Sequence, residues 1–193
     1  MKKLKGYSRV TTVLGWLNSA WKEYWYRKAG FEAADKISKE SQEIGKLVHS
    51  FIELYLNTGA EPVLGNEGRC AAIIIQWLKE NVVKPLYIEQ ELKDIKLKLV
   101  GHCDLIVETD GEQVIIDYKT SKKIDKSYAL QLAAYAHMAN KQLGTKINKG
   151  IILRVDKDPA AEIPLEVVEY IPLKAYWAIF LCGLKFYKFM NGK

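Results

Sequence analysis

Two aspartates and a lysine lie in a largely apolar stretch near the middle of the chain, at Asp104, Asp117 and Lys119. Between the two apolar runs, Asp110-Gly111 predicts a two-residue hairpin turn, because a type I′ turn needs positive φ at both central positions. This turn fixes a register in which Asp104 lies opposite Asp117, and strand alternation places Lys119 on the same face. Opposed like charges destabilise a sheet. The arrangement therefore predicts a catalytic site in which Mg²⁺ or Mn²⁺ offsets the repulsion between the carboxylates.

An alternative is that Asp117 and Lys119 form an ordinary ion pair on an exposed edge of the sheet. Both residues lie within otherwise apolar strands, where solvated side chains would be placed less regularly. The pattern therefore favours the catalytic interpretation.

The elements that position these residues follow from hydrophobic periodicity. Alternation with period two predicts strands at 86–92, 96–108, 112–119, 149–155 and 166–171. Helical periodicity and end signals predict helices at 10–29, 41–56, 67–82, 127–143 and 173–190. This order predicts an α/β fold in which helices flank a mixed central sheet that contains an antiparallel meander.

Two of the predicted helices carry side chains with two possible roles. In helix 41–56 the apolar stripe comprises Ile44, Leu47, Val48, Phe51, Ile52 and Tyr55. His49 lies outside this stripe, where it is either a structural histidine or a ligand for a metal or a phosphate. Helix 10–29 presents Trp16, Trp21 and Trp25, which either pack on the core or stack on nucleic-acid bases.

Composition narrows the classes of partner and compartment. The 193 residues include 29 Lys and Arg against 23 Asp and Glu, a net charge of +6 that favours a polyanionic partner. Three cysteines without a CxxC pair indicate a reducing compartment, so we expect a cytoplasmic protein. The longest apolar run, residues 175–184, is about half of what a membrane span requires, and it predicts a buried helix.

Four sequence motifs, in this order along the chain, resemble those of the RecB-type exonuclease branch of the PD-(D/E)XK nuclease superfamily. They are Gly45-x-x-x-His49, Gly101-x-x-Asp104, Ile116-Asp117-Tyr118-Lys119-Thr120 and Gln131-Leu132-x-x-Tyr135-Ala136. The branch includes many phage and prophage enzymes. The resemblance implies a restriction-endonuclease-like fold in one nuclease domain, residues 1–193. Its helical part would span about 1–84, its catalytic sheet about 85–172 and its last helix 173–190.

The chain departs from the superfamily pattern in two places. Cys103 replaces the proline that names the motif, which is common in this branch. Iron–sulfur members of the branch use four cysteines, whereas Cys70, Cys103 and Cys182 do not fall at the positions those members use. An iron–sulfur cluster needs about four thiolates, so we expect none here.

The resemblance implies a function as well as a fold. It implies a Mg²⁺- or Mn²⁺-dependent deoxyribonuclease with one or two ions, most simply an exonuclease, acting in repair, recombination or phage DNA processing in a bacterial or phage-infected cell. The expected partner is DNA that is single-stranded or has free ends. No association with a membrane is expected. RNA as substrate, endonuclease activity and the oligomeric state stay open. The alternative is a catalytically inactive nuclease-fold module that binds DNA.

The resemblance also implies residue roles. The expected catalytic residues are Asp104, Asp117 and Lys119. The expected metal ligands are His49, Glu91, Asp104, Asp117 and the backbone carbonyl of Tyr118. Glu89 shares a strand face with Glu91, and the choice between these acids stays open. The expected DNA contacts are Thr120, Ser121, Lys122, Gln131 and Tyr135. For Gln131 and Tyr135, support of Lys119 or ordinary packing between helix and sheet are alternatives.

Overall fold

The computed structural model describes residues 6–63, 65–81 and 84–192, except for the side chains of Trp21 and Lys22. In chain order the elements are β1 (Ser8–Arg9), α1 (Val10–Leu17), α2 (Ser19–Ala29), α3 (Phe31–Thr58), α4 (Asn66–Asn81), β2 (Lys84–Asp94), β3 (Leu99–Thr109), β4 (Glu112–Lys119), α5 (Ser127–Gln142), β5 (Lys149–Val155), β6 (Leu165–Tyr170) and α6 (Leu173–Met190). None of the described helices combines the length and apolar character that crossing a membrane requires.

The described strands form one mixed sheet with the order β1-β3-β4-β5-β6, and β2 pairs with the other edge of β3. The β2–β3, β3–β4 and β5–β6 pairs are antiparallel, whereas β1–β3 and β4–β5 are parallel. The parallel pair β4–β5 is connected through α5. The predicted α/β class, with an antiparallel meander in a mixed sheet, is confirmed.

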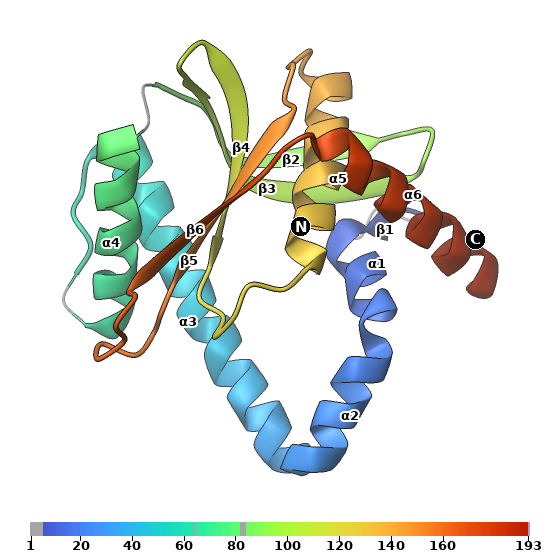
Figure 1. The fold of residues 1–193 in the computed structure, drawn as a ribbon, viewed down its shortest axis with the longest axis horizontal. Helices are drawn as coiled ribbons and strands as arrows, with labels where there is room; N and C mark the ends of the chain where they lie inside the picture. The colour runs from blue at the N-terminus through green and yellow to red at the C-terminus, as the bar shows by residue number, and fades with distance from the viewer. Residues whose placement is uncertain (1–5, 64, 82–83, 193) are drawn as a thin grey trace.

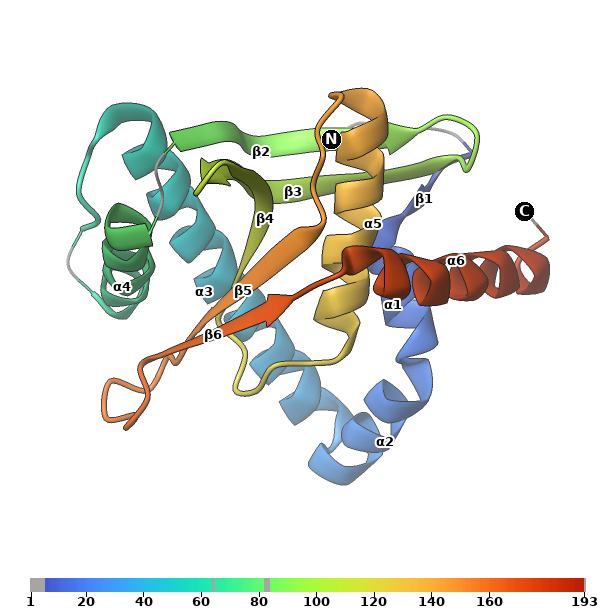
Figure 2. The same cartoon turned by 45° about the horizontal axis from the view of Figure 1, so that its top comes forward.

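Helices cover both faces of this sheet (Figures 1 and 2). One buried cluster joins α1, α5 and α6 to one face, with Leu132, Met138 and Phe180 among its largest members. The other joins α3 and α4 to the opposite face, around Ile52 and Ile74. Below the sheet, α2 and α3 diverge from a shared turn and form a V (Figure 1). The chain therefore passes from one face of the sheet to the other through α1, α2 and α3.

The hairpin register agrees with the sequence prediction as far as the paired residues extend. Asp110 and Gly111 have φ of 51° and 76°, as a type I′ turn requires. The pairing runs from Thr109↔Glu112 to Leu105↔Ile116. Beyond Leu105 the pairing of β3 with β4 ends, one residue before the expected Asp104–Asp117 pair, whereas the pairing of β4 with β5 continues to Lys119.

Several predicted elements need correction. The single helix expected at 10–29 is two helices separated at Asn18, and the helix expected at 41–56 begins ten residues earlier, at Phe31. The last residue of the helix expected at 67–82 lies outside the described residues, as do residues 1–5. Leu47 was expected in a buried stripe, but 48% of its surface is exposed. The run 175–184 is buried on one side only, because Ile179 is exposed.

Candidate active site

The site forms where β3 and β4 separate. Asp104 is the first residue of β3 beyond the paired segment, and its Oδ2 accepts the backbone N–H of Tyr118 at 2.8 Å. The carboxylate thus replaces a ladder hydrogen bond that the divergence of the strands removes. Only 10% of the Asp104 side chain is exposed, and its other oxygen faces His49. Asp104 is therefore held rigidly with one oxygen left to bind a ligand.

His49 reaches the sheet from α3. Its Nε2 lies 3.2 Å from the carbonyl oxygen of Tyr118, and since a carbonyl only accepts, Nε2 carries the proton. The Nδ1 atom then points to carboxylate oxygens, 3.5 Å from Asp104 and 3.8 Å from Glu89. The hydrogen bond from Nε2 to the Tyr118 carbonyl fixes the orientation of the His49 ring, as the hydrogen-bond partners of metal-bound histidines do. It also engages the Tyr118 carbonyl, which was expected to bind the metal directly.

Glu89, rather than Glu91, lies at this site. Ligand atoms of His49, Glu89 and Asp104 all fall within 4.8 Å of one another. The Glu89 carboxylate also lies 3.2 Å from Nδ1 of His102 on the neighbouring strand. Glu91, the acid chosen from the sequence, instead forms an ion pair with Lys93 at 2.5 Å.

Local backbone geometry explains this difference between two acids on one strand face. Glu89 has a φ of +46°, in the left-handed region that residues with a side chain rarely adopt. The ladder between β2 and β3 runs through Ile88↔Leu105 and Gln90↔Cys103 and skips Glu89. The distortion directs Glu89 toward His49, which simple alternation could not predict.

Asp117 and Lys119 lie beside this cluster as a buried ion pair. The Asp117 side chain is 2% exposed and its Oδ1 accepts a hydrogen bond from Gln131 at 3.0 Å. The Lys119 ammonium also lies 5.0 Å from the centre of the Tyr128 ring. The exposed edge pair considered as an alternative is therefore excluded, since both side chains are largely removed from solvent.

The charges of the site act on one another. Burial lowers the pKa of His49, but the charge of Asp104 and the contact with Glu89 outweigh it and raise this pKa to about 9. Burial raises the pKa of Asp117 to about 6; the charge of Lys119 opposes this rise and that of Asp104 adds to it. Burial lowers the pKa of Lys119, but Asp117 and Asp104 outweigh it, so that the pKa is raised overall. The carboxylates thus stabilise positive charge at the site.

The donor set fits a divalent cation. Two carboxylates and one imidazole nitrogen converge from three different elements, and a third carboxylate, that of Asp117, lies next to them. Carboxylate oxygens with an imidazole nitrogen suit Mg²⁺ and, more closely, Mn²⁺. Burial is the main cause of the raised pKa of Asp117, and a cation at this place would offset the smaller contribution that comes from the charge of Asp104.

Tyr135, expected to contact DNA, is buried beneath the sheet with 2% of its surface exposed. A Cβ atom on Gly101 would lie 2.3 Å from its ring, so Tyr135 requires glycine at position 101. Its hydroxyl accepts a hydrogen bond from Gln131 at 3.3 Å. Gln131 and Tyr135 thus support Asp117 from below, which agrees with the packing alternative rather than with a contact to DNA.

The segment after Lys119 carries the other expected DNA contacts. Thr120 and Ser121 are half-buried and Lys122 is exposed. The backbone carbonyls of Ser121 and Lys122 each lie 3.4 Å from Nη1 of Arg154, which is buried on β5. Asp156 and Glu166 balance the charge of Arg154, at 2.9 and 2.8 Å. Arg154 therefore fixes this segment to the sheet.

A groove of about 680 Å³ leads to the site between α3 and the segment after Lys119. We call it the lysine groove, because Lys119, Lys122 and Lys157 line it. Trp25 and Tyr128 line it too, so Trp25 of the predicted aromatic face is not in the core. Trp16, in contrast, packs edge-on against Tyr187 in the core, with 5.7 Å between ring centroids. Lys157 bridges the groove by a 3.0 Å hydrogen bond to Ser41 of α3.

Three residues that sequence reasoning did not single out contribute to this region: His102, Arg154 and Lys157. Arg154 had a usable signal, because a charged residue in the middle of the apolar run 151–155 must have buried partners. His102 and Lys157 had none, since their roles depend on chain segments far away in the sequence.

Comparisons with known proteins identify the family of the chain. Residues 67–176 match the PD-(D/E)XK nuclease superfamily. The crystal structure of the protein SSO0001 is 15% identical and has a TM-score of 0.45, with 94% of this chain and 78% of that chain covered. A protein from Eubacterium rectale described as a "putative exonuclease" is 13% identical with a TM-score of 0.49, over 79% of this chain and 68% of the other. No curated protein matches the chain. The match spans more than half of the sequence, so the chain belongs to the PD-(D/E)XK nuclease superfamily.

Proposed function

We propose that this nuclease is a Mg²⁺- or Mn²⁺-dependent exonuclease of the RecB type that hydrolyses DNA from free ends, in repair, recombination or phage DNA processing in the cytoplasm. The observation that carries the proposal is the convergence of Asp104, Glu89 and His49 beside the buried pair Asp117–Lys119 at the inner end of the lysine groove. An inactive DNA-binding module would have no need of a buried carboxylate and ammonium at this place, since burying charges is costly.

The residues have distinct roles in this proposal. Asp104, Glu89 and His49 would hold the cation, with Asp117 beside them, and a bound cation would supply a Lewis acid for the phosphate and lower the pKa of water. The Lys119 ammonium orients the attacking water and stabilises charge that develops on the phosphate oxygens. The oxygen of this water forms the new bond to phosphorus and the water releases a proton to solvent; the P–O bond to the leaving sugar breaks, and the leaving oxygen takes up a proton from solvent. Gln131 holds Asp117 in place through its 3.0 Å hydrogen bond.

The lysine groove supports a preference for single strands. Its three lysines neutralise phosphates, and Trp25 and Tyr128 offer aromatic surfaces on which bases stack, a combination typical of sites for single-stranded nucleic acid. The groove lies between the segment that follows Lys119 and the helices α2 and α3, which are joined at Gly30. A strand that enters along this groove from a free end would reach the site at its inner end.

Cleavage of end-labelled DNA tests this proposal. We expect linear single strands to be degraded in Mg²⁺ or Mn²⁺, circular single strands to resist, and EDTA to stop the reaction. An RNA strand of the same sequence tests the choice of sugar. Lys119→Ala and Asp117→Asn should each lower the rate about a hundredfold or more, because each removes charge stabilisation from the transition state.

The controls are circular dichroism spectra of both variants, which should match the parent. Full activity in excess EDTA, or in either folded variant, would contradict the assignment of the site. Equal rates on linear and circular single strands would contradict exonuclease action, although the protein would still be a nuclease.

A further inference from the structure

Helix α6 is apolar on two opposite sides. One side is buried in the core and carries Leu173, Phe180, Leu184 and Tyr187. At about 100° per residue, the opposite side carries a row of exposed residues that alternates in steps of four and three: Ala175, Ile179, Cys182, Phe186 and Phe189. We call this row, with the adjacent exposed Met190, the outer seam. A helix that is apolar all round is normally buried on every side, so the outer seam lacks the cover that its composition predicts.

The outer seam is large enough to form an interface. Its four largest side chains are each between 55 and 80% exposed: Ile179, Phe186, Phe189 and Met190. At about 200 Å² for a fully exposed side chain of this size, they expose roughly 500 Å² together. Two such surfaces in contact would bury roughly 1,000 Å², which is the area at which specific protein interfaces begin.

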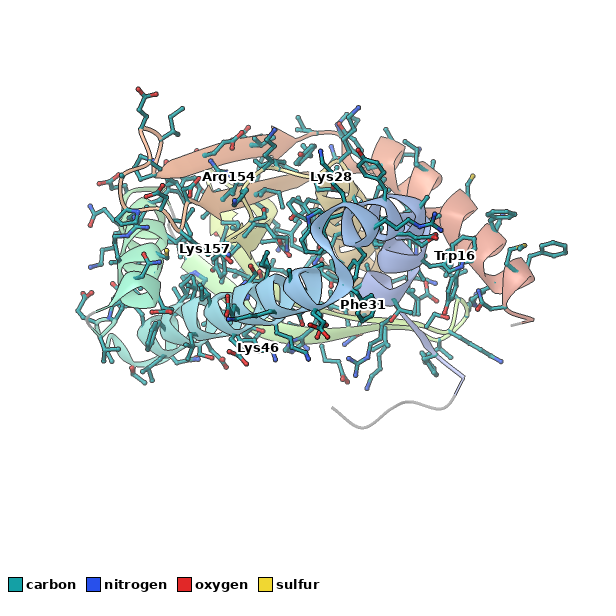
Figure 3. All side chains as sticks on the ribbon, turned by 90° about the horizontal axis from the view of Figure 1, so that it is seen from below. Trp16, Lys28, Phe31, Lys46, Arg154 and Lys157 are labelled. Carbon is teal, nitrogen blue, oxygen red and sulfur yellow. The ribbon has the colours of Figure 1, made fainter. Side chains whose placement is uncertain are left out.

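The position of α6 leaves the outer seam accessible. The helix lies at one end of the molecule (Figure 2), and seen from below its outer side chains point away from the ribbon, with Trp16 beside the helix (Figure 3). The Trp16 ring contacts Phe186 edge-on, with 5.5 Å between ring centroids. The core side of α6 belongs to the cluster on one face of the sheet, whereas α3, which carries His49, covers the other face. A partner on the outer seam would therefore leave the active site open.

The distribution of side chains along the outer seam matches a second copy of the same helix. Steps of four and three residues are the spacing by which one helix packs along another. Small residues, Ala175 and its exposed neighbour Ala178, lie in the first half of α6, and Phe186 and Phe189 lie in the second half. An antiparallel pair would place the aromatic half of each copy on the alanine half of the other. A parallel pair would oppose the aromatic rings and leave the alanines apart.

We propose that two copies of this chain associate through antiparallel packing of their α6 helices, which buries the outer seam of both copies. The contact is isologous, since the same surface serves on each copy, and Cys182 lies near the two-fold axis. This inference goes beyond the proposed nuclease function and does not depend on it.

Measurement of the oligomeric state tests the inference. Size-exclusion chromatography with light scattering should give twice the mass of one chain for the parent. Ile179→Glu and Phe189→Glu should each give the mass of one chain, because each would bury an unpaired charge in the contact. The matched controls Ile163→Glu and Phe31→Glu change residues that are 63 and 74% exposed outside α6, and they should stay dimeric. Circular dichroism should show that all four variants are folded.

Cysteine crosslinking tests the orientation of the two helices. Cys182 is exposed, whereas Cys70 and Cys103 are buried, so a short bismaleimide should link two parent chains through Cys182 and fail in Cys182→Ser. In the Cys182→Ser background, a mixture of Ala175→Cys and Phe189→Cys chains should crosslink, and neither variant should crosslink alone. The two positions lie about 21 Å apart along one helix, so only an antiparallel pair brings them together.

Three results would overturn the inference. A parent that stays monomeric at every concentration would leave no dimer, and binding of this monomer to anionic lipid vesicles would assign the outer seam to a membrane surface. A dimer that persists in both glutamate variants of α6 would place the interface elsewhere. Crosslinking of Ala175→Cys chains to one another would replace the antiparallel pair with a parallel one. If the glutamate variants do not fold, the crosslinking of the parent and of Cys182→Ser decides.

Discussion

Glu89 holds an unusual backbone conformation for a residue with a side chain. A φ of +46° in a non-glycine residue costs free energy and persists only where surrounding contacts hold it. Here the contacts are polar, since His49 and His102 lie 3.8 and 3.2 Å from the two carboxylate oxygens. Strain at this position therefore serves to direct a carboxylate to the site rather than to improve packing.

The pair Glu89 and Glu91 offers a matched test of this assignment. Glu89→Gln should lower the cleavage rate about tenfold or more, because it weakens a group that holds the cation. Glu91→Gln removes the same charge two residues away, where the carboxylate only pairs with Lys93, and should leave the rate within about twofold. Initial rates at fixed Mn²⁺ measure both. Equal losses of cleavage rate in the two variants would mean that Glu91 also contributes to the site.

How far the sequence predicts the site depends on whether a residue follows regular geometry. Asp117 and Lys119 could be placed on one face because strand alternation determines it, and the two-residue turn brought Asp104 to the same end of the hairpin, although the ladder ends one residue before the expected Asp104–Asp117 pair. Glu89 could not be chosen over Glu91, because a left-handed residue inside a strand leaves no pattern in composition. The burial of Tyr135 could not be predicted, because it depends on the room that Gly101, on another element, leaves for its ring.

At the scale of elements, Arg154 joins β5 to the segment between β4 and α5. Lys119 itself is held by the β4–β5 ladder, in which it pairs with Arg154, whereas Ser121 and Lys122 lie beyond the ladder. Their carbonyls depend on the guanidinium of Arg154, which also pairs with Glu166. A lysine has no such fork of donors and cannot make all these contacts at once.

Arg154→Lys should therefore loosen the segment while leaving Lys119 in place. Trypsin should cut after Lys122 or Lys123 at least about tenfold faster than in the parent, and KM for DNA should rise while kcat changes little. Glu166→Gln is the control, since it keeps Arg154 and an acceptor oxygen for it. A parental cleavage pattern in Arg154→Lys, or a loss of kcat alone, would show that the segment does not depend on Arg154.

A second connection between elements lies at the far end of β2. Asp94 has a fully buried side chain that accepts hydrogen bonds from Leu97 N–H at 3.0 Å and from Lys141 at 2.7 Å, and it lies 3.2 Å from His137. Burial raises the pKa of Asp94, but the hydrogen bonds, that from Lys141 foremost, outweigh it and leave the pKa below its ordinary value. Asp94 thus ties the sheet to α5.

This lowered pKa gives the stability of the protein a defined pH dependence. The contribution of Asp94 is complete above the ordinary aspartate pKa of about 3.9 and is lost as pH falls through the lower pKa of the folded state. Asp94→Asn should lower the free energy of unfolding by roughly 2 kcal/mol at pH 7, given that Lys141 is partly exposed. Urea unfolding at pH 7, 5 and 3 should show this difference shrinking only at pH 3. A difference independent of pH would mean that the charge of Asp94 contributes nothing.

At the scale of the whole molecule, the order of elements and the class of fold were predictable, whereas the V that α2 and α3 form below the sheet was not. Strands and core helices carry regular apolar patterns because one side of each is buried. The first turns of α3 carry few buried residues, Ala34 among them, so no apolar stripe marked their start. The lysine groove follows in part from this missed part of α3, because Ile37 and Ser38 line it.

The whole fold should also respond to the cation, because the proposed ligands come from α3, β2 and β3 and meet only when the chain is folded. A ligand that binds only the folded state at about 100 times its Kd stabilises by about 2.7 kcal/mol. For a protein of this size, that shifts the melting temperature by about 5–10 °C. Scanning calorimetry with Mn²⁺ should show this shift in the parent and in Glu91→Gln, and a smaller one in Asp104→Asn and Glu89→Gln. An equal shift in all four proteins would place the ion elsewhere, and no shift in the parent at millimolar Mn²⁺ would remove these residues as its ligands.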